Sequence, residues 1–342
     1  MFQKKSKGLF AEVSHYQVRL ARTDRTIAPV EVEAVDLIPI TTVEETREAI
    51  NAFAGNPKSA YIQAQCSIYP EDRFIFRHHQ ENAARSKQDD FAEKALLGEL
   101  KVEPENVRYR ILHPGTGKSY NPDELLSRET LFVGASREGL KNEQKRLIDL
   151  GLYPNRLEIS SVSLYAGIKK ALAEKEMDTS VLVIEFAENS SYGYVINPTG
   201  LALSHPIDFG ISAVAKSIQS ELGLQDTLSA RKVMLSKTFD FRDMGSTLLR
   251  HLILQVRAST GQFEVKTGKS VHYIFIPDLP DSLSWVGEIL AEELGMEVWR
   301  PALTDWSSSG GIELSSRASQ HENLSEFFPL FCQMAQLDAA SS

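Results

Sequence analysis

Cysteine is scarce, because the 342-residue chain contains only Cys66 and Cys332. The two lie far apart, and neither has a second thiol or a histidine at the spacing of a metal site. This pattern excludes a disulfide framework and a cysteine-based zinc site. It predicts two buried, reduced thiols, as is typical of cytosolic proteins.

Long apolar runs are missing as well. The best candidate, residues 248–256, is interrupted by Arg250, His251 and Gln255, whereas a membrane-spanning helix needs roughly 18 apolar residues. The start, MFQKKSKG, is basic but is not followed by the apolar core of a signal peptide. Its lysines would touch anionic lipid only weakly, at about 1 kcal/mol per charge. The sequence therefore predicts no membrane span and a location inside the cell.

Basic residues are fewer than acidic ones, which gives the chain a formal net charge of −9 and a pI near 5.5. The field of such a protein repels phosphate backbones, so nucleic acid is not an expected partner. No Gly-x-Ser-x-Gly elbow follows a strand, so the sequence gives no support for a serine hydrolase.

Two kinds of secondary structure alternate along the chain. Helices are predicted over 42–53, 137–150, 160–171, 211–222, 243–258 and 281–294, from helical periodicity between capping residues and glycines. Strands are predicted over 59–66, 107–112, 130–134, 181–186 and 271–276, from β-branched and aromatic residues. This is an α/β pattern, and the length and the 42% hydrophobic content suit two lobes.

One unit of this pattern occurs twice: a strand, a tight polar turn, two further strands and then a helix. The first copy begins at GLFAEVSHYQVRLAR, and the second is SVLVIEFAENSSYGYVIN followed by GLALSHPIDF. The repetition predicts a duplicated fold with a ligand cleft between the halves.

The stretch LHPGTGKS at 112–119 ends like a phosphate-binding loop. A P-loop, however, needs a glycine where Leu112 stands and a helix that begins at the lysine and serine. Pro122 would lie inside that helix without an N–H to donate. We therefore interpret GTGKS as a loop between a strand and the short DELLS turn.

The two hairpins and the run from Thr130 to Pro206 resemble the PilM family of cytoplasmic type IV pilus assembly proteins. The segments FVGASREGLKNEQKRLIDLGLYPNRLEISSVSLYAGIKKAL and HPIDFGISAVAKSIQSELGL are the most similar stretches, and the likeness covers most of the chain. The resemblance implies a duplicated actin-like (ribonuclease H-like) two-lobe fold with a small inserted accessory subdomain, as in the related protein FtsA.

The family's first hairpin carries an aspartate, a glycine and a lysine around the phosphates of ATP. Aligned on FAEVSHYQVR, these fall on Glu12, Ser14 and Arg19. Glu12 and Arg19 keep the charges of the family's aspartate and lysine. The β-carbon of Ser14, however, leaves less room than glycine for a phosphate to approach the backbone.

The family's Asp-x-Gly of the second hairpin falls on Glu185-Phe186-Ala187, followed by Glu188 and Asn189. Ala187 again replaces a glycine, and Glu188 adds negative charge near the position of the triphosphate. The family's third motif, a glycine-rich turn under the adenine, corresponds to 277–282, which contains two prolines and no glycine. By resemblance the nucleotide positions are thus Glu12, Ser14, Arg19, Glu185, Ala187 and Asn189, and together they predict a degenerate site.

Two other interpretations of these residues stay open. In one, Glu12 and Glu185 still coordinate Mg²⁺, since glutamate is as good a ligand as aspartate for a hard cation, and ATP and Mg²⁺ are then cofactors. In the other, Glu12 is an outward-facing strand residue and Arg19 a side chain that reaches to solvent at a strand end.

The resemblance also divides the chain into regions. The first lobe is expected over 1–160, with the accessory subdomain at about 88–127. The second lobe is expected over 161–310, and a linker with a C-terminal helix that returns to the first lobe over 311–342. Ser307 to Gly311 have linker composition, and His78 and His79 are interpreted as solvated loop residues rather than as a metal site.

The sequence and the resemblance together predict a scaffold protein with a degenerate nucleotide cleft, a pseudo-ATPase without catalytic residues. The family resemblance implies a cytoplasmic location peripheral to the inner membrane and other pilus-machine components as partners. It also implies a membrane partner of the PilN type, whose N-terminal peptide would add to an exposed strand at 107–112 or 130–134. The alternatives are an active actin-like ATPase and the cytoplasmic part of a GspL-type secretion protein.

Overall fold

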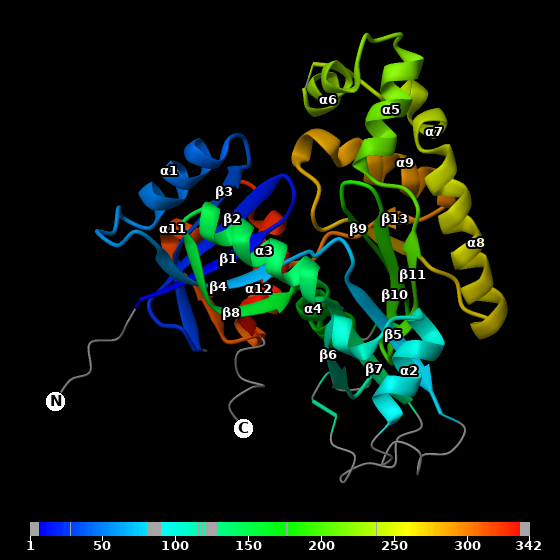
Figure 1. Ribbon diagram of the computed structural model, residues 1–342, viewed down its shortest axis with the longest axis horizontal. Coiled ribbons are helices and arrows are strands. Elements are labelled where there is room, and N and C mark those ends of the chain that lie inside the picture. The colour runs from blue at the N-terminus through cyan, green and yellow to red at the C-terminus, as the bar shows by residue number, and fades with distance from the viewer. Residues whose placement is uncertain are drawn as a thin grey trace. The chain divides into compact units, whose positions relative to one another are not determined.

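The computed structural model describes residues 7–27, 29–80, 90–114, 117, 119–120, 129–175, 177–236 and 238–335 (Figure 1). The chain forms two compact units. Unit 1 comprises 1–171 and 301–342, and unit 2 comprises 172–300. The chain passes between them within a helix after Ala171 and again after Arg300, rather than at the expected boundaries after 160 and 310.

Unit 1 is built on a six-stranded sheet with the spatial order β14-β3-β2-β1-β4-β8. β1 pairs antiparallel with β2 and parallel with β4, β2 pairs antiparallel with β3, and β8 and β14 extend the two edges in parallel. The strands are β1 (Gly8–Val13), β2 (Gln17–Thr23), β3 (Val30–Pro39), β4 (Ile62–Ile68), β8 (Leu152–Ile159) and β14 (Ile312–Leu314).

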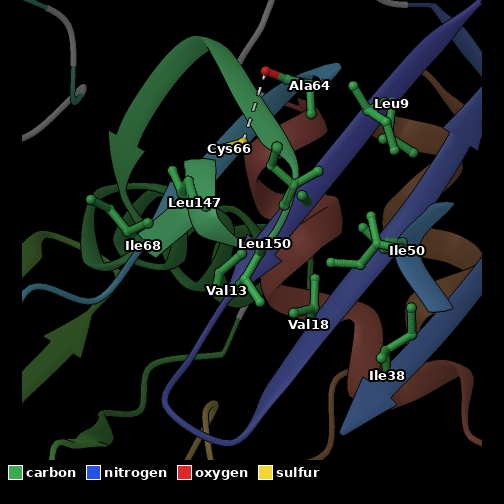
Figure 2. Packing of buried hydrophobic residues seen from close by; sticks show 14 residues of the cluster. Leu9, Val13, Val18, Ile38, Ile50, Ala64, Cys66, Ile68, Leu147 and Leu150 are labelled. Carbon is green, nitrogen blue, oxygen red and sulfur yellow. Dashed lines mark hydrogen bonds between the residues drawn. The ribbon is translucent and has the colours of Figure 1, made fainter. Parts of the chain in front are cut away.

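Helices cover both faces of this sheet. Figure 2 shows one face, where side chains of β1 to β4 pack against Ile50 of α1 (Val43–Phe53) and against Leu147 of α3 (Arg137–Asp149). Thr42 caps α1 as predicted, because its hydroxyl accepts from the N–H of Glu45. Since alternate residues of a strand face opposite sides, Phe10 and Glu12 of β1 face the other side.

The C-terminal part of the chain packs on that second face. α12 (Phe328–Ala335) contacts β1, β2 and β14, and Ser67 of β4 donates a hydrogen bond to Oε1 of Gln333 at 3.1 Å. Cys332 lies in α12, and Cys66 lies in the core of Figure 2. Both thiols are buried as predicted, and burial raises the pKa of Cys66 to about 12.

Residues 303–314, expected to include a linker, form regular structure instead. α10 (Leu303–Ser309) contains the three serines of the predicted linker, and β14 follows directly. Tertiary contacts hold this segment in a helix although its composition is typical of a linker. Trp306 donates from Nε1 to the carbonyl of Gly167 at 3.2 Å and packs on Phe328. The remaining short elements of this region are α11 (Ser316–Ser319) and the 3₁₀ turn η4 (Leu324–Phe327).

Unit 2 repeats the strand order of unit 1. Its sheet runs β11-β10-β9-β12-β13, with two antiparallel pairs followed by two parallel pairs. In unit 1 the corresponding order is β3-β2-β1-β4-β8, so the predicted duplication is confirmed. The strands are β9 (Val181–Phe186), β10 (Ser191–Asn197), β11 (Gly200–Ile207), β12 (Tyr273–Phe275) and β13 (Glu297–Val298).

The helices of unit 2 depart from the sequence prediction in two places. The helix predicted over 243–258 is divided at Leu249 into two. A helix after residue 226 was not predicted at all. The helices are α5 (Ile211–Glu221), α6 (Thr227–Leu235), α7 (Arg242–Leu248), α8 (Arg250–Thr267) and α9 (Ser284–Leu294), the last preceded by η3 (Asp281–Leu283). α4 (Ser160–Glu174) is the helix shared by the two units.

A three-stranded sheet within unit 1 forms the inserted subdomain. Its order is β5-β7-β6, with β5 (Phe74–His79), β6 (Val107–Leu112) and β7 (Glu129–Ser136) all antiparallel. α2 (Phe91–Leu100) covers one face, on Phe74, Phe76 and Phe132, and η2 (Pro104–Asn106) leads into β6. Because β7 is the central strand, the expectation that 130–134 is an exposed strand is wrong.

The two histidines predicted to lie in a loop end strand β5 instead. His78 Nδ1 lies 3.1 Å from Glu99 Oε1, and His79 Nδ1 lies 3.5 Å from Glu129 Oε1. Among the described residues, no group of three or more His, Cys, Asp or Glu is arranged to hold a metal ion, and no helix is long and apolar enough to cross a membrane.

Candidate functional site

The first hairpin places Glu12 and Arg19 directly opposite each other in neighbouring strands. Arg19 Nη1 donates to Glu12 Oε2 at 2.5 Å, and the two side chains are 2% and 0% exposed. Burial alone would lower the pKa of Arg19, but the charge and the hydrogen bond of Glu12 outweigh it and raise that pKa. The interpretation of both as solvent-facing residues is therefore wrong.

This ion pair does not suit Mg²⁺. A magnesium site needs several oxygen ligands around the ion, whereas one oxygen of Glu12 already contacts a guanidinium whose charge would repel a cation. Oε1 of Glu12 is buried and has no hydrogen-bond partner among the described residues, but a single oxygen beside an arginine is not a magnesium site.

The turn after β1 is closed by the side chain of Ser14. Its hydroxyl accepts from the N–H groups of Tyr16 and Gln17, each at 3.3 Å. The N–H of Ser14 donates to the carbonyl of Gln17 at 3.0 Å, and Arg146 of α3 donates to the carbonyl of Ser14. A phosphate-binding turn must direct free N–H groups at its ligand. Here these three amides are used within the turn.

The second hairpin places Glu185 at the position in β9 that Glu12 has in β1. Its side chain is fully buried, and Tyr194 of β10 donates its hydroxyl to Glu185 Oε1 at 2.6 Å. A tyrosine thus contacts the carboxyl group in unit 2 where an arginine does so in unit 1.

The turn after β9 is closed by the start of α5. The N–H groups of Ile211 and Ser212 donate to the carbonyls of Ala187 and Glu188 at 3.1 and 2.9 Å, and that of Ala187 donates to Ser190 at 2.9 Å. The next two amides of α5 donate to the carbonyl of Gly210. The first amides of the helix, which would be available to an anion, are therefore already used.

Gly210 makes this close approach sterically feasible. A β-carbon there would lie 2.5 Å from the backbone carbon of Asn189 and 2.6 Å from Glu188 O and Ser190 N. Asn189 itself lies at the exposed tip of the turn.

Glu188 adds its own negative charge at the same helix start. Its carboxylate accepts from Arg231 of α6, whose Nη1 lies 3.2 Å from Oε2, and from the hydroxyl of Ser212. Sequence reasoning singled out Glu188 as unfavourable to a triphosphate. It missed Tyr194, which lies within the second hairpin itself, and it missed Gly210, Arg231 and Arg146, which come from other parts of the chain.

The P-loop-like stretch lies only partly among the described residues. Gly115, Thr116, Lys118 and the DELLS turn fall outside them. What is described is a turn: the N–H of Gly117 donates to the carbonyl of His113, and Ser119 pairs with Leu112 in an antiparallel bridge. The region corresponding to the family's adenine turn runs from β12 through Asp278, which is buried, into η3.

Comparison with known proteins supports the fold. A solved PilM–PilN type IV pilus biogenesis complex matches with a TM-score of 0.69, 15% identity and 98% of both chains covered. The cytoplasmic domain of EpsL, an inner-membrane component of the type II secretion system of Vibrio cholerae, matches with a TM-score of 0.41 and 12% identity over 98% and 96% of the two chains.

A Bacteroides thetaiotaomicron protein with an actin-like ATPase fold and unknown function matches with a TM-score of 0.42 and 10% identity over 96% and 98%. Scores as low as these last two carry no further argument. No family model and no curated protein matches the sequence. The chain has the actin-like fold, and the predicted likeness to PilM is confirmed at the level of the fold.

Proposed function

We propose that the protein is a scaffold component of a type IV pilus or related secretion assembly machine. It binds the cytoplasmic N-terminal peptide of a PilN-type membrane protein and is thereby held at the cytoplasmic side of the inner membrane. The observation that carries this proposal is the similarity of fold, over 98% of both chains, to a PilM–PilN complex.

The scaffold role does not need ATP. Both hairpin turns are closed by groups of the protein itself, Ser14 in unit 1 and the start of α5 in unit 2. Glu12 is paired with Arg19, and Glu188 carries negative charge at the start of α5. These contacts support a degenerate nucleotide cleft and argue against the ATPase alternative.

The test is a binding titration with the labelled N-terminal peptide of the PilN-type protein from the same organism. We expect a micromolar Kd, about −8 kcal/mol, that is the same with and without Mg·ATP. A scrambled peptide of the same composition is the control.

Three results would contradict the proposal in different ways. Absence of binding at millimolar protein would reject the PilN-type partner. Binding only with Mg·ATP would favour the ATPase. Binding instead to the partner peptide of a secretion system would favour the GspL-type alternative.

A further inference from the structure

Within the described part of the chain, the outer edge of β6 in the inserted sheet is only partly paired. Ile111 directs its carbonyl away from β7, because this oxygen accepts from the N–H of Tyr120 at 2.9 Å. Backbone groups alternate in direction along a strand, so those of Val107 and Tyr109 also point outward. The N–H of Val107 is bonded to Pro104.

A short window of backbone groups therefore has no partner among the described residues. It consists of the carbonyl of Val107, the N–H and carbonyl of Tyr109, and the N–H of Ile111. Neighbouring groups on both sides are already bonded, which limits an added strand to this window. Such a row of donors and acceptors is what a peptide pairs with when it adds to a sheet.

The side chains beside this window are basic. Arg108 and Arg110 project from the face of the sheet opposite α2, and both are exposed. Neither arginine forms an ion pair within the described structure. Arg110 has only a longer-range electrostatic interaction with Glu158, whose carboxylate contacts Arg156 and Ser163. Tyr109, between them, packs against the apolar core under α2.

These charges decide which strand can add to the edge. If a second copy paired antiparallel about Tyr109, Arg108 of each chain would lie opposite Arg110 of the other, and like charges directly opposite are destabilising. A peptide with carboxylates at these two places would instead form two cross-strand ion pairs.

We propose that the β6 edge binds an extended peptide with two carboxylates separated by one apolar residue. The carboxylates pair with Arg108 and Arg110, and the apolar residue lies beside Tyr109 on the α2 face. The inference rests on the proposed function for the identity of the partner, because it specifies the chemistry of the peptide that this scaffold takes.

The probe is a labelled synthetic peptide in which glutamate and valine alternate, followed by fluorescence anisotropy. Three comparison peptides accompany it: one with lysine in place of glutamate, one N-methylated on the amides that would pair with β6, and the PilN-type peptide. The expected result is saturable binding of the glutamate peptide, weaker at high salt, with loss of binding on N-methylation.

The decisive variant is Arg108→Glu/Arg110→Glu. Both side chains are exposed, so the fold should be retained, as a thermal unfolding curve will verify. We expect the glutamate peptide to bind about tenfold more weakly and the lysine peptide to bind better than it does to the parent protein. Arg250→Glu, an exposed arginine in α8 of unit 2, is the matched control and should change neither affinity.

The outcomes separate this inference from the proposed function. Equal binding of the N-methylated peptide, or unchanged binding to the double variant, would overturn strand addition at β6. If the PilN-type peptide binds and the glutamate peptide does not, the inference is wrong and the proposed function stands. If only the glutamate peptide binds, in the charge-dependent manner described, the inference holds and the PilN-type partner is rejected.

Discussion

The two hairpins carry a glutamate at corresponding positions of β1 and β9 but surround it differently. Glu12 faces Arg19 across the ladder in a buried ion pair, whereas Glu185 accepts from the hydroxyl of Tyr194. The turns differ in the same way: Ser14 closes the first with its own hydroxyl, and the start of α5 closes the second. Two copies of one supersecondary unit thus use different groups to contact the glutamate and to close the turn.

The comparison also shows which contacts are local. The hydroxyl of Ser14 bonds residues two and three positions away, and Arg146 of α3 adds a contact to its carbonyl. Closing the second turn needs the start of α5, and in particular the close approach of Gly210. Substitutions in the two hairpins should therefore change the free energy of unfolding by unequal amounts, and the following experiments measure these changes from the largest to the smallest.

Arg19→Met should have the largest effect. It leaves the buried carboxylate of Glu12 without its cation, at a cost of about 3–5 kcal/mol in the free energy of unfolding. The double variant Glu12→Met/Arg19→Met should recover most of this loss. Urea denaturation measures both.

The control for that experiment is Arg22→Met in the same strand. Arg22 pairs with Glu33 at 3.1 Å, but both side chains are about one quarter to one third exposed, so we expect a cost of about 1 kcal/mol or less. Equal costs for Arg19→Met and Arg22→Met would show that the buried pair is not the distinguishing feature of the first hairpin.

Gly210→Ala should be the next most damaging change. The new β-carbon would meet only backbone atoms, at 2.5–2.6 Å, so the second turn and α5 must move apart at a cost of about 3 kcal/mol. Gly261→Ala in α8, where a β-carbon meets nothing within 4 Å, should instead stabilise by about 0.5–1 kcal/mol. If Gly210→Ala left the free energy of unfolding unchanged, the second turn would not be held against the start of α5.

Tyr194→Phe should have a smaller effect, about 1–2 kcal/mol, because it removes one hydrogen bond to a buried carboxyl group. Tyr153→Phe on the exposed side of β8 serves as its control and should change the free energy of unfolding by less than about 0.5 kcal/mol. A Tyr194→Phe cost as large as that of Arg19→Met would erase the predicted difference between the two lobes.

Much of this organisation could be predicted from local pattern. The duplicated hairpins show as repeated strands with tight polar turns, whereas the interpretation of Ser14 and Ala187 as replaced turn glycines came only from the family resemblance. The linker at 307–311 was predicted wrongly because the burial of Trp306 against α4 and α12 depends on distant residues. The roles of Gly210 and Arg231 were missed for the same reason, since helix packing brings them to the second turn. Tyr194 is close to Glu185 in sequence, and its role was missed because it depends on the register of β9 against β10.

The central claim is that the hairpins have lost the phosphate-binding arrangement, and a thermal unfolding titration with Mg·ATP tests it most directly. A ligand at about 100 times its Kd stabilises the native state by about 2.7 kcal/mol, which would raise the Tm visibly. The account predicts an unchanged Tm up to millimolar Mg·ATP. A dose-dependent rise that is lost in Glu12→Gln or Glu185→Gln would contradict it and make these glutamates part of a working nucleotide site.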